Sequence, residues 1–296
     1  MAGAKGRCVT EPQGPATVCI VGLGLMGGSL ALALREAPGA RSRIIGVARK
    51  AEVLDAARAA GAIDEGTSDL AEGVAGANTV VLATPVRTIL RMLPQVGRSA
   101  RPGALVLDLG SSKSQICAAM AELPDGLQPV GGHPMCGKEV AGFAAAGAGL
   151  FRDRPFVLCP LPRTAPEALE AAIGLARAVG ARPILLDPAV HDRAVAGVSH
   201  LPYAAAAALV NCVAAADDPV AWSLASSGFR DTSRLAGSDV EMMLDILLTN
   251  REAVVDWLTR YAIQVDQLRS AIAAGDESDL RGLMAAAQHA RTRLTV

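Results

Sequence analysis

Three glycines, Gly22, Gly24 and Gly27, constrain the fold of this chain more than any other feature of its sequence. They follow an apolar run, "TVCIVG" (17–22), and precede the helix-like segment "LALALRE" (30–36). A strand, a turn with this glycine spacing and a helix are typical of the first unit of a dinucleotide-binding domain. Gly22 permits the tight turn, Gly24 lets a pyrophosphate approach the backbone, and Gly27 lets the helix pack closely on the strand.

The start of the helix after this turn is the expected phosphate site. The first N–H groups of a helix have no partner within the helix and attract an anion. We therefore expect the turn, together with Leu25 and Met26, to bind the pyrophosphate of a cofactor. The alternative is a glycine turn that only serves packing.

Strand-like and helix-like segments alternate along the first two thirds of the chain. The run "AEVLDAARAAG" (51–61) predicts a helix. A second helix is predicted over 164–180, with Thr164 as N-cap, Glu167 completing a capping box and Gly180 ending the helix. Further strands are predicted at 43–48, 79–85, 104–110, 127–131, 154–160 and 182–187. This alternation predicts an α/β fold of the Rossmann type, with a mostly parallel sheet covered on both faces.

After Pro188 the remaining segments are all helix-like. We therefore predict a flexible N-terminal tail (1–16), a dinucleotide-binding domain (17–188) and an all-helical dimerisation and substrate domain (189–296). The apolar stretch "LPYAAAAALVNCVAAA" contains Asn211 and is shorter than the ~20 residues that span a bilayer, so we expect a buried helix. Its small side chains allow close helix approach, which favours a homodimer formed through the helical domain.

The composition excludes several classes of protein. The chain is 51% hydrophobic and 19% charged, with a net charge of −1 and 3% aromatic residues, which is unlike a nucleic-acid-binding protein. Its six cysteines show no CxxC pair, so neither a disulfide framework nor a metal site is predicted. The first residues lack the apolar run of a signal peptide. We expect a cytoplasmic protein without nucleic-acid or membrane partners.

The end of the second predicted strand, "IIGVARK", bears on the choice of cofactor. Proteins that prefer NAD usually carry an acidic residue there, which binds the ribose hydroxyls. Here Ala48 takes that place, and Arg49 and Lys50 follow it. Two cations and no carboxylate favour the 2′-phosphate of NADP, although NAD stays possible. The alternative is that both cations belong to a solvated helix start.

Polar residues follow three of the predicted strands, where an open parallel sheet places its ligands. Thr84 and Pro85 end one strand, and "DLGSSK" (108–113) is expected to expose Ser111, Ser112 and Lys113 after the next. The segment "GGHP" is expected to form a loop that exposes His133 after a third. A histidine with a pKa near neutrality is suited to take a proton from a hydroxyl as hydride leaves the same carbon. A turn histidine bonded to its own backbone is the alternative.

Five motifs together resemble the prephenate/arogenate dehydrogenase family. They are "GLGLMGGSLALAL", "DLGSSK", "GGHPMCGKEVAG", "HDRAVAGVSHLPY" and "FRDTSRLAGSDVEMMLDILLTN", and they occur in the family's order from residue 17 onward. The resemblance implies an NAD(P)-dependent oxidative decarboxylation in tyrosine biosynthesis. It also implies a Rossmann domain followed by an all-helical domain that forms a homodimer.

The resemblance also implies roles for particular residues. The family's catalytic histidine falls on His133, which would accept the proton of the substrate ring hydroxyl. Its serine falls on Ser111, which would hydrogen-bond the same hydroxyl, and its substrate-binding arginine falls on Arg234. A planar guanidinium is suited to bind a carboxylate with two hydrogen bonds. No metal is implied.

The sequence departs from the family pattern near the expected substrate side chain. Family members often have a second histidine in "SHLPH", where this chain has Tyr203, and Ser226 and Ser227 replace glycines. These departures leave open whether the substrate is prephenate or arogenate. His191 and His200 match family histidines, and each is either a substrate-pocket residue or a core histidine. His289 is expected at the surface.

Two other functions compete with this one. A 3-hydroxyacid dehydrogenase would share the two-domain plan, but it usually needs a lysine on the first long helix of the second domain. The segment "HDRAVAGVSHLPYAAAA" contains no lysine. A non-catalytic nucleotide-binding redox sensor would not need Ser111, His133 and Arg234 together.

Overall fold

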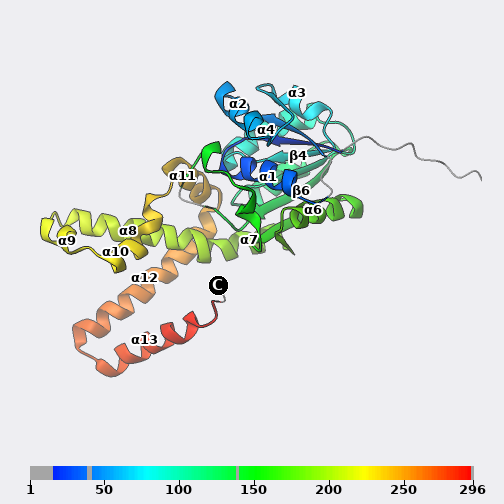
Figure 1. Cartoon of the computed structure of the whole chain (residues 1–296). Helices are drawn as coiled ribbons and strands as arrows, with labels where there is room; N and C mark the ends of the chain where they lie inside the picture. The colour runs from blue at the N-terminus through cyan, green and yellow to red at the C-terminus, as the bar shows by residue number, and fades with distance from the viewer. Residues whose placement is uncertain (1–15, 39–41, 138–139, 295–296) are drawn as a thin grey trace, which may run out of the picture.

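The computed structural model describes residues 16–38, 42–137 and 140–294. Nearly all of the predicted N-terminal tail lies outside these residues. The described chain forms one eight-stranded sheet with helices on both faces, followed by an all-helical part that extends away from it (Figure 1). The predicted fold class is confirmed.

The sheet has the strand order β3-β2-β1-β4-β5-β6-β7-β8, and only β6 and β7 pair in antiparallel fashion. Most of its strands are short runs of buried apolar residues, as expected for a sheet covered on both faces. The exposed or half-buried β3 has no such pattern, which is why the sequence did not predict it. The strands are β1 (Thr17–Val21), β2 (Arg43–Val47), β3 (Glu65–Thr67), β4 (Thr79–Leu82), β5 (Leu105–Asp108), β6 (Gln128–Pro134), β7 (Pro155–Pro160) and β8 (Arg182–Leu185).

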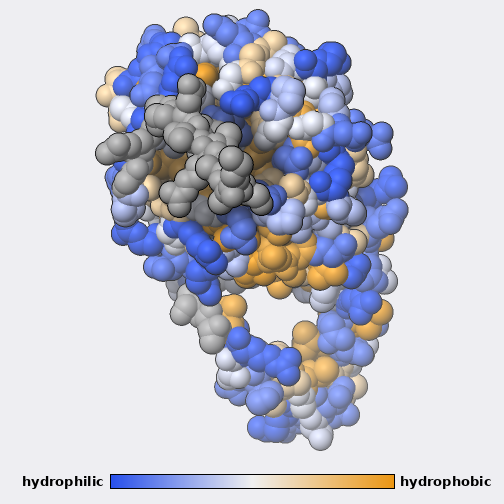
Figure 2. Space-filling model, turned by 90° about the vertical axis from the view of Figure 1, so that its right-hand side faces the viewer, coloured by the Kyte–Doolittle hydropathy of each residue, from blue (hydrophilic) through white to orange (hydrophobic). Residues whose placement is uncertain are grey.

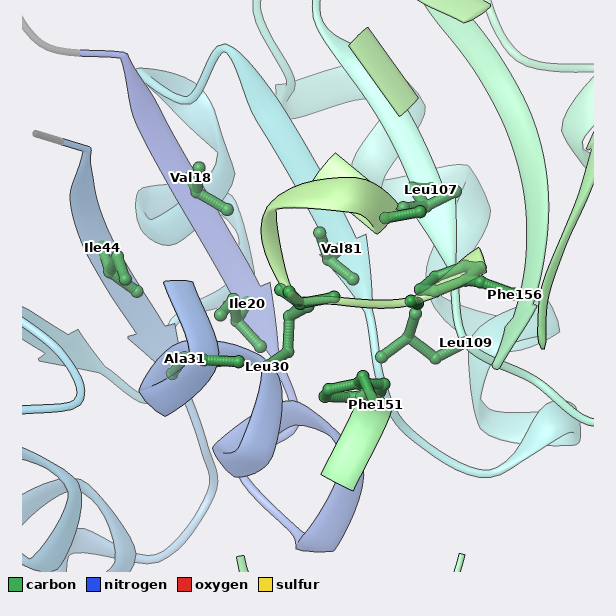
Figure 3. Close-up of a cluster of buried hydrophobic side chains, with 14 of the residues drawn as sticks. Val18, Ile20, Leu30, Ala31, Ile44, Val81, Leu107, Leu109, Phe151 and Phe156 are labelled. Carbon is green, nitrogen blue, oxygen red and sulfur yellow. The ribbon is translucent and has the colours of Figure 1, made fainter. Parts of the chain in front are cut away.

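Two hydrophobic cores lie on the two faces of the sheet. In one, Leu30 of helix α1 packs with Ile20, Val81 and the ring pair Phe151 and Phe156 (Figure 3). This face is covered by α1 (Leu25–Glu36), α2 (Ala51–Ala59), α6 (Pro166–Ala178) and the short 3-10 helices η1 (Phe143–Ala145) and η2 (Ala148–Phe151). The other face is covered by α3 (Leu70–Ala75), α4 (Val86–Ser99) and α5 (Ser114–Ala121).

The start of α6 differs from the prediction. The helix begins at Pro166, and its N-cap, Ala165, makes no side-chain capping bond, so the predicted capping box of Thr164 and Glu167 is wrong. Thr164 Oγ1 instead accepts a hydrogen bond from Leu161 N at 2.9 Å and donates one to Pro129 O at 2.6 Å. One hydrogen bond to strand β6 and one to the preceding loop thus replace the cap. The predicted end at Gly180 is confirmed, because its φ is +79°.

The helical part begins with a single long run from Pro188 to Ala215. It consists of α7 (Pro188–Val195), a π-helical turn, η3 (Ala196–His200), and α8 (Leu201–Ala215). A π-turn adds a residue to one helical turn and is frequent at functional sites. The remaining elements are α9 (Pro219–Leu224), α10 (Ser227–Ser233), the 3-10 helix η4 (Arg234–Gly237), α11 (Val240–Thr249), α12 (Arg251–Ala274) and α13 (Glu277–Arg291).

Most of these helices form an arm that stands away from the sheet (Figure 1). An opening separates part of the arm from the body of the molecule, and hydrophobic side chains gather beside it (Figure 2). The long run from residue 188 to 215 is long and apolar enough to cross a membrane, by length and composition only, and little of it is buried. Our expectation of a short, buried helix is therefore wrong for the single chain, because α7 and α8 join and only one residue of α8, Ala206, is buried.

Candidate active site

The glycine turn after β1 has the shape that a dinucleotide phosphate requires. Gly22 has a φ of +96°, and a Cβ on Gly27 would lie 1.9 Å from the Gly22 carbonyl oxygen. Gly24 faces open space, because a Cβ added there would have no described atom within 4 Å. The 12-residue helix α1 begins directly after Gly24, which makes no side-chain capping bond. The turn therefore leaves space for an anion. The N–H groups of Leu25 and Met26, at the start of α1, are available to bind it.

Two more predicted cofactor segments lie beside this turn. A Cβ on Gly22 would meet Thr84 Cγ2 at 2.7 Å, so the Thr84–Pro85 segment after β4 borders it. Gly22 N donates to Val47 O at 2.8 Å, which fixes the end of β2 against the same turn. Ala48 follows half-buried, and the exposed Arg49 and Lys50 come next.

His133 lies in strand β6 and not on a loop, so that prediction is wrong. Antiparallel pairing with β7 extends β6 through Pro134 and pairs His133 with Val157. The parallel pairing of β5 with β6 ends earlier, at Val130. His133 therefore projects beyond the carboxyl end of β5, and only 9% of the residue is exposed.

A buried ion pair holds this part of β6. Asp108 and Lys113 pair with both side chains 0% exposed. Asp108 accepts from Gly132 N at 2.9 Å and from Gly110 N at 2.7 Å, and Lys113 Nζ donates to Gly132 O at 2.7 Å. The predicted exposure of Ser112 and Lys113 is therefore wrong, because both side chains turn inward to polar partners.

His133 is the end of a chain of three hydrogen-bonded side chains. Its Nδ1 lies 2.8 Å from His191 Nε2, with the two rings edge to face. His191 Nδ1 lies 2.8 Å from Asp192 Oδ1. Asp192 also accepts from the backbone N–H groups of Lys113 at 2.7 Å and Ser114 at 2.8 Å, so it caps α5 from another element.

The electrostatics of this chain keep Asp192 charged and His133 neutral. Burial raises the pKa of Asp192, but the hydrogen bonds from His191, Ser114 and Lys113 outweigh it and leave the pKa below its ordinary value. Burial lowers the pKa of His133 well below that of a free histidine, and the neighbouring His191 and Lys113 lower it further. A neutral imidazole is the form that accepts a proton.

The third histidine of the cluster, His200, lies in the π-turn. Asn250 Nδ2 donates to Asp192 O at 2.8 Å and lies 3.2 Å from His200 Nδ1. Burial lowers the pKa of His200 to about 4. Its Nε2 is buried and has no hydrogen-bond partner among the described residues, so one polar atom of this cluster remains for a ligand or water.

Polar contacts join the sheet domain to the helices here. Ser112 Oγ lies 2.7 Å from Thr249 Oγ1. Arg87, at the start of α4, forms an ion pair with Asp245 of α11 and donates to it from its backbone N at 3.1 Å. These contacts, and the roles of Asp108, Asp192 and Asn250, were not predicted from the sequence. The only sequence signal for these three residues was their position inside the quoted motifs.

The remaining predicted residues occupy different settings. Ser111 is half-buried in the connection from β5 to α5, and Tyr203 is half-buried on α8. Arg234 is exposed and begins η4, which packs against α8. Ser226 is the N-cap residue of α10, and His289 is exposed on α13 as expected.

The mostly parallel sheet, the glycine turn into α1 and the polar cluster beyond the strand ends define a dinucleotide-binding protein of the Rossmann type. Two family models match the chain: prephenate dehydrogenase, nucleotide-binding domain, over residues 30–185, and prephenate dehydrogenase, dimerization domain, over residues 187–286. The chain belongs to the prephenate dehydrogenase family.

Individual relatives agree with this assignment. The chain is 35% identical over 269 residues to the prephenate dehydrogenase of Bacillus subtilis, covering 89% of this chain and 72% of that protein. The crystal structure of prephenate dehydrogenase from A. aeolicus with hydroxyphenyl propionate and NAD+ matches with a TM-score of 0.88 and 29% identity, covering 96% and 100% of the two chains. Synechocystis arogenate dehydrogenase matches with a TM-score of 0.80 and 34% identity, covering 94% and 99%.

Proposed function

We propose that this protein is a prephenate dehydrogenase, which converts prephenate to 4-hydroxyphenylpyruvate by NAD(P)-dependent oxidative decarboxylation in tyrosine biosynthesis. The observation that carries the proposal is the position of His133, a buried neutral imidazole beyond the carboxyl end of β5. Carboxyl ends of parallel strands are where such folds bind their ligands. Family membership and relatives named for prephenate chemistry support the same substrate.

The reaction requires a base at one ring hydroxyl. His133 accepts the hydroxyl proton as the carbon–hydrogen bond of that carbon breaks and its carbonyl forms. When bound, the nicotinamide supplies the acceptor for the hydride. Loss of the ring carboxylate as carbon dioxide then makes the ring aromatic, and the phenolic oxygen takes the proton back. His133 is therefore neutral again at the end of the reaction.

Other residues of this chain bind and orient the substrate in this proposal. Ser111 hydrogen-bonds the ring hydroxyl, and Arg234 binds a carboxylate with its planar fork. The orphaned Nε2 of His200 and the half-buried side chain of Tyr203 lie on the helix run that also supplies His191, and they contact the substrate side chain. Replacement of Arg234 by lysine keeps the charge but loses the fork, so the Michaelis constant for the substrate rises.

Arogenate is the alternative substrate. Tyr203 stands where many family members have a histidine, and an arogenate dehydrogenase is among the structural relatives. Arogenate carries an amino acid side chain where prephenate carries a keto acid. A side-by-side assay with the two substrates separates the two functions.

We further propose a cytoplasmic homodimer built from a domain of residues 17–188 and a helical domain of residues 189–296. The family match for a dimerization domain supports this assembly. So does the exposure of large apolar side chains on the arm, where Leu224 is 75% and Val198 is 74% exposed. A second copy would cover the apolar helix run of residues 188–215 as well. Sedimentation as a monomer at micromolar concentration would contradict the dimer.

The test of function is reduction of NADP or NAD in the presence of prephenate. The absorbance of the reduced nicotinamide and the release of carbon dioxide are the two measurements. We expect His133→Ala to lower kcat by roughly 10²-fold or more with cofactor affinity retained, because a positioned base contributes about that factor. His289→Ala, which changes an exposed histidine on α13, is the matched control and retains full activity. Near-normal turnover of His133→Ala would remove His133 from the mechanism.

A further inference from the structure

We propose that His191 and Asp192 are positioning residues that hold the single proton of the neutral His133 ring on Nδ1, so that Nε2 is the atom facing the substrate as a base. The inference rests on the proposed function for its kinetic consequences. The protonation pattern itself is a property of the free protein and can be tested without any substrate.

The direction of the hydrogen bonds is set at Asp192. A carboxylate only accepts hydrogen bonds, and here it receives the N–H groups of Lys113 and Ser114. The depressed pKa of Asp192 agrees with the charged form. His191 Nδ1, at 2.8 Å from the same carboxylate, must therefore be the donor of that bond.

The next bond follows from the first. A neutral imidazole carries one N–H, so a His191 ring that donates from Nδ1 has a lone pair on Nε2. That lone pair lies 2.8 Å from His133 Nδ1, which must then carry the proton of the His133 ring. Nε2 of His133 is left with its lone pair. A histidine free in water prefers the opposite form, with the proton on Nε2, so the pattern is a diagnostic consequence of the two neighbours.

The groups around His133 also favour a neutral ring before the reaction. Burial disfavours a positive charge on His133, and His191, Lys113 and His200 disfavour it further, while the Asp192 carboxylate favours it. During turnover the O–H bond of the substrate breaks and an N–H bond forms at Nε2. The resulting imidazolium still donates from Nδ1 to His191, whose other nitrogen is bonded to the Asp192 carboxylate. The His191 ring thus connects the negative charge of the Asp192 carboxylate to the positive charge that develops on His133.

The pattern can be read directly by nitrogen-15 NMR, because the chain has only four histidines. We expect the substrate-free protein at neutral pH to show His133 and His191 both protonated on Nδ1 and not on Nε2. Signals are assigned by their loss in His133→Gln and His191→Gln, with His289→Gln as the exposed control. A His133 ring protonated on Nε2, including the case where His191 carries protons on both nitrogens, would overturn the inference.

A pair of variants tests the consequence for catalysis. The ring of His191→Phe fills the site but accepts no hydrogen bond, so His133 reverts to the Nε2–H form and kcat falls by roughly 10²-fold, the order typical of a lost general base. His191→Gln presents a side-chain oxygen to His133 Nδ1 and recovers most of that loss. Substrate KM and cofactor affinity stay within about twofold in both variants, and only His191→Phe changes the pH profile of kcat.

The outcomes of these experiments are separable from those of the proposed function. If the wild type oxidises neither prephenate nor arogenate, the proposed function is wrong, and the NMR result still decides the protonation pattern. If the wild type is active and His191→Phe and His191→Gln lose kcat equally, or lose none, the positioning role is wrong. A His191→Phe protein that does not fold leaves the decision to the wild-type spectrum.

Discussion

Lys113 and Asp108 form an ion pair whose two side chains are both 0% exposed, five residues apart at the carboxyl end of β5. Together they bind both backbone polar groups of Gly132, the residue before His133: Asp108 accepts from its N–H, and Lys113 donates to its carbonyl oxygen. Gly132 is also packed against β5 so closely that a Cβ would lie 2.4 Å from Asp108 O. The ion pair therefore fixes the strand segment that carries the proposed base.

We expect Lys113→Met to destabilise the protein by about 3–5 kcal/mol, because it leaves the Asp108 charge buried without its partner. The double variant Asp108→Asn, Lys113→Met removes both charges and should recover part of that loss. Urea unfolding measures both effects. Arg281→Met breaks an ion pair in which both partners are highly exposed, and it should change nothing measurable. Equal losses in the single and double variants would show that the cost does not come from an unpaired charge.

The pH dependence of stability follows from the buried histidines. His200 has its pKa lowered by burial from 6.5 to about 4. As the pH falls from 6.5 to about 4, His200 becomes protonated in the unfolded chain but stays neutral in the folded protein. The free energy of unfolding therefore decreases. The stabilisation is fully present above pH 6.5, and its loss approaches about 3 kcal/mol near pH 4. His133 contributes in the same direction.

Urea unfolding across the same pH window tests this expectation. His200→Gln should flatten the curve, because a glutamine does not titrate. His289→Gln should not, because that histidine is exposed in the folded protein. If the wild type and His200→Gln lose stability in parallel as the pH falls, burial of His200 is not the cause.

The sequence predicted those parts of the molecule that depend on local pattern. Apolar runs of four to seven residues became strands, and the glycine spacing 22, 24 and 27 became a turn whose close contacts admit no side chain at Gly27. The helical character of the chain after Pro188 was also visible. These features arise from the hydrophobicity and conformational freedom of neighbouring residues, which a sequence displays directly.

The site was harder to predict because its contacts join distant residues. His133 was placed on a loop because its glycine-rich surroundings do not show the antiparallel partner β7. Lys113 was expected to be exposed because it follows the end of a predicted strand, and its partner Asp108 was read only as part of a motif. Asp192 caps α5 across 78 residues of sequence, which no local pattern reveals.

The glycine turn offers a paired test of cofactor binding and folding. Gly27→Ala places a methyl group 1.9 Å from a backbone oxygen, so α1 must shift, and we expect a loss of about 1–3 kcal/mol in unfolding free energy. Gly24→Ala places its methyl group in open space, so the protein folds normally. That space is where a pyrophosphate approaches the backbone, and cofactor affinity should fall by about tenfold or more. A Gly24→Ala protein that binds NADP and NAD like the wild type would place the phosphates elsewhere.

The choice of cofactor is the last prediction, and we expect NADP to be preferred over NAD. Gly22 N bonds to the end of β2, so the residues that follow, Ala48, Arg49 and Lys50, begin beside the turn. Both cations are exposed and available to a 2′-phosphate, and Ala48 supplies no carboxylate to repel it. One hydrogen bond to a charged partner contributes about 1.5–3 kcal/mol, or roughly one to two powers of ten in affinity.

Arg49→Ala should therefore reduce kcat/KM with NADP by about that factor and leave kcat/KM with NAD unchanged. Arg98→Ala, at the far end of α4, is the control for removal of an exposed arginine and should leave the preference intact. A wild type that prefers NAD, or an Arg49→Ala protein with unaltered preference, would mean that Arg49 and Lys50 are only solvated side chains at the start of α2.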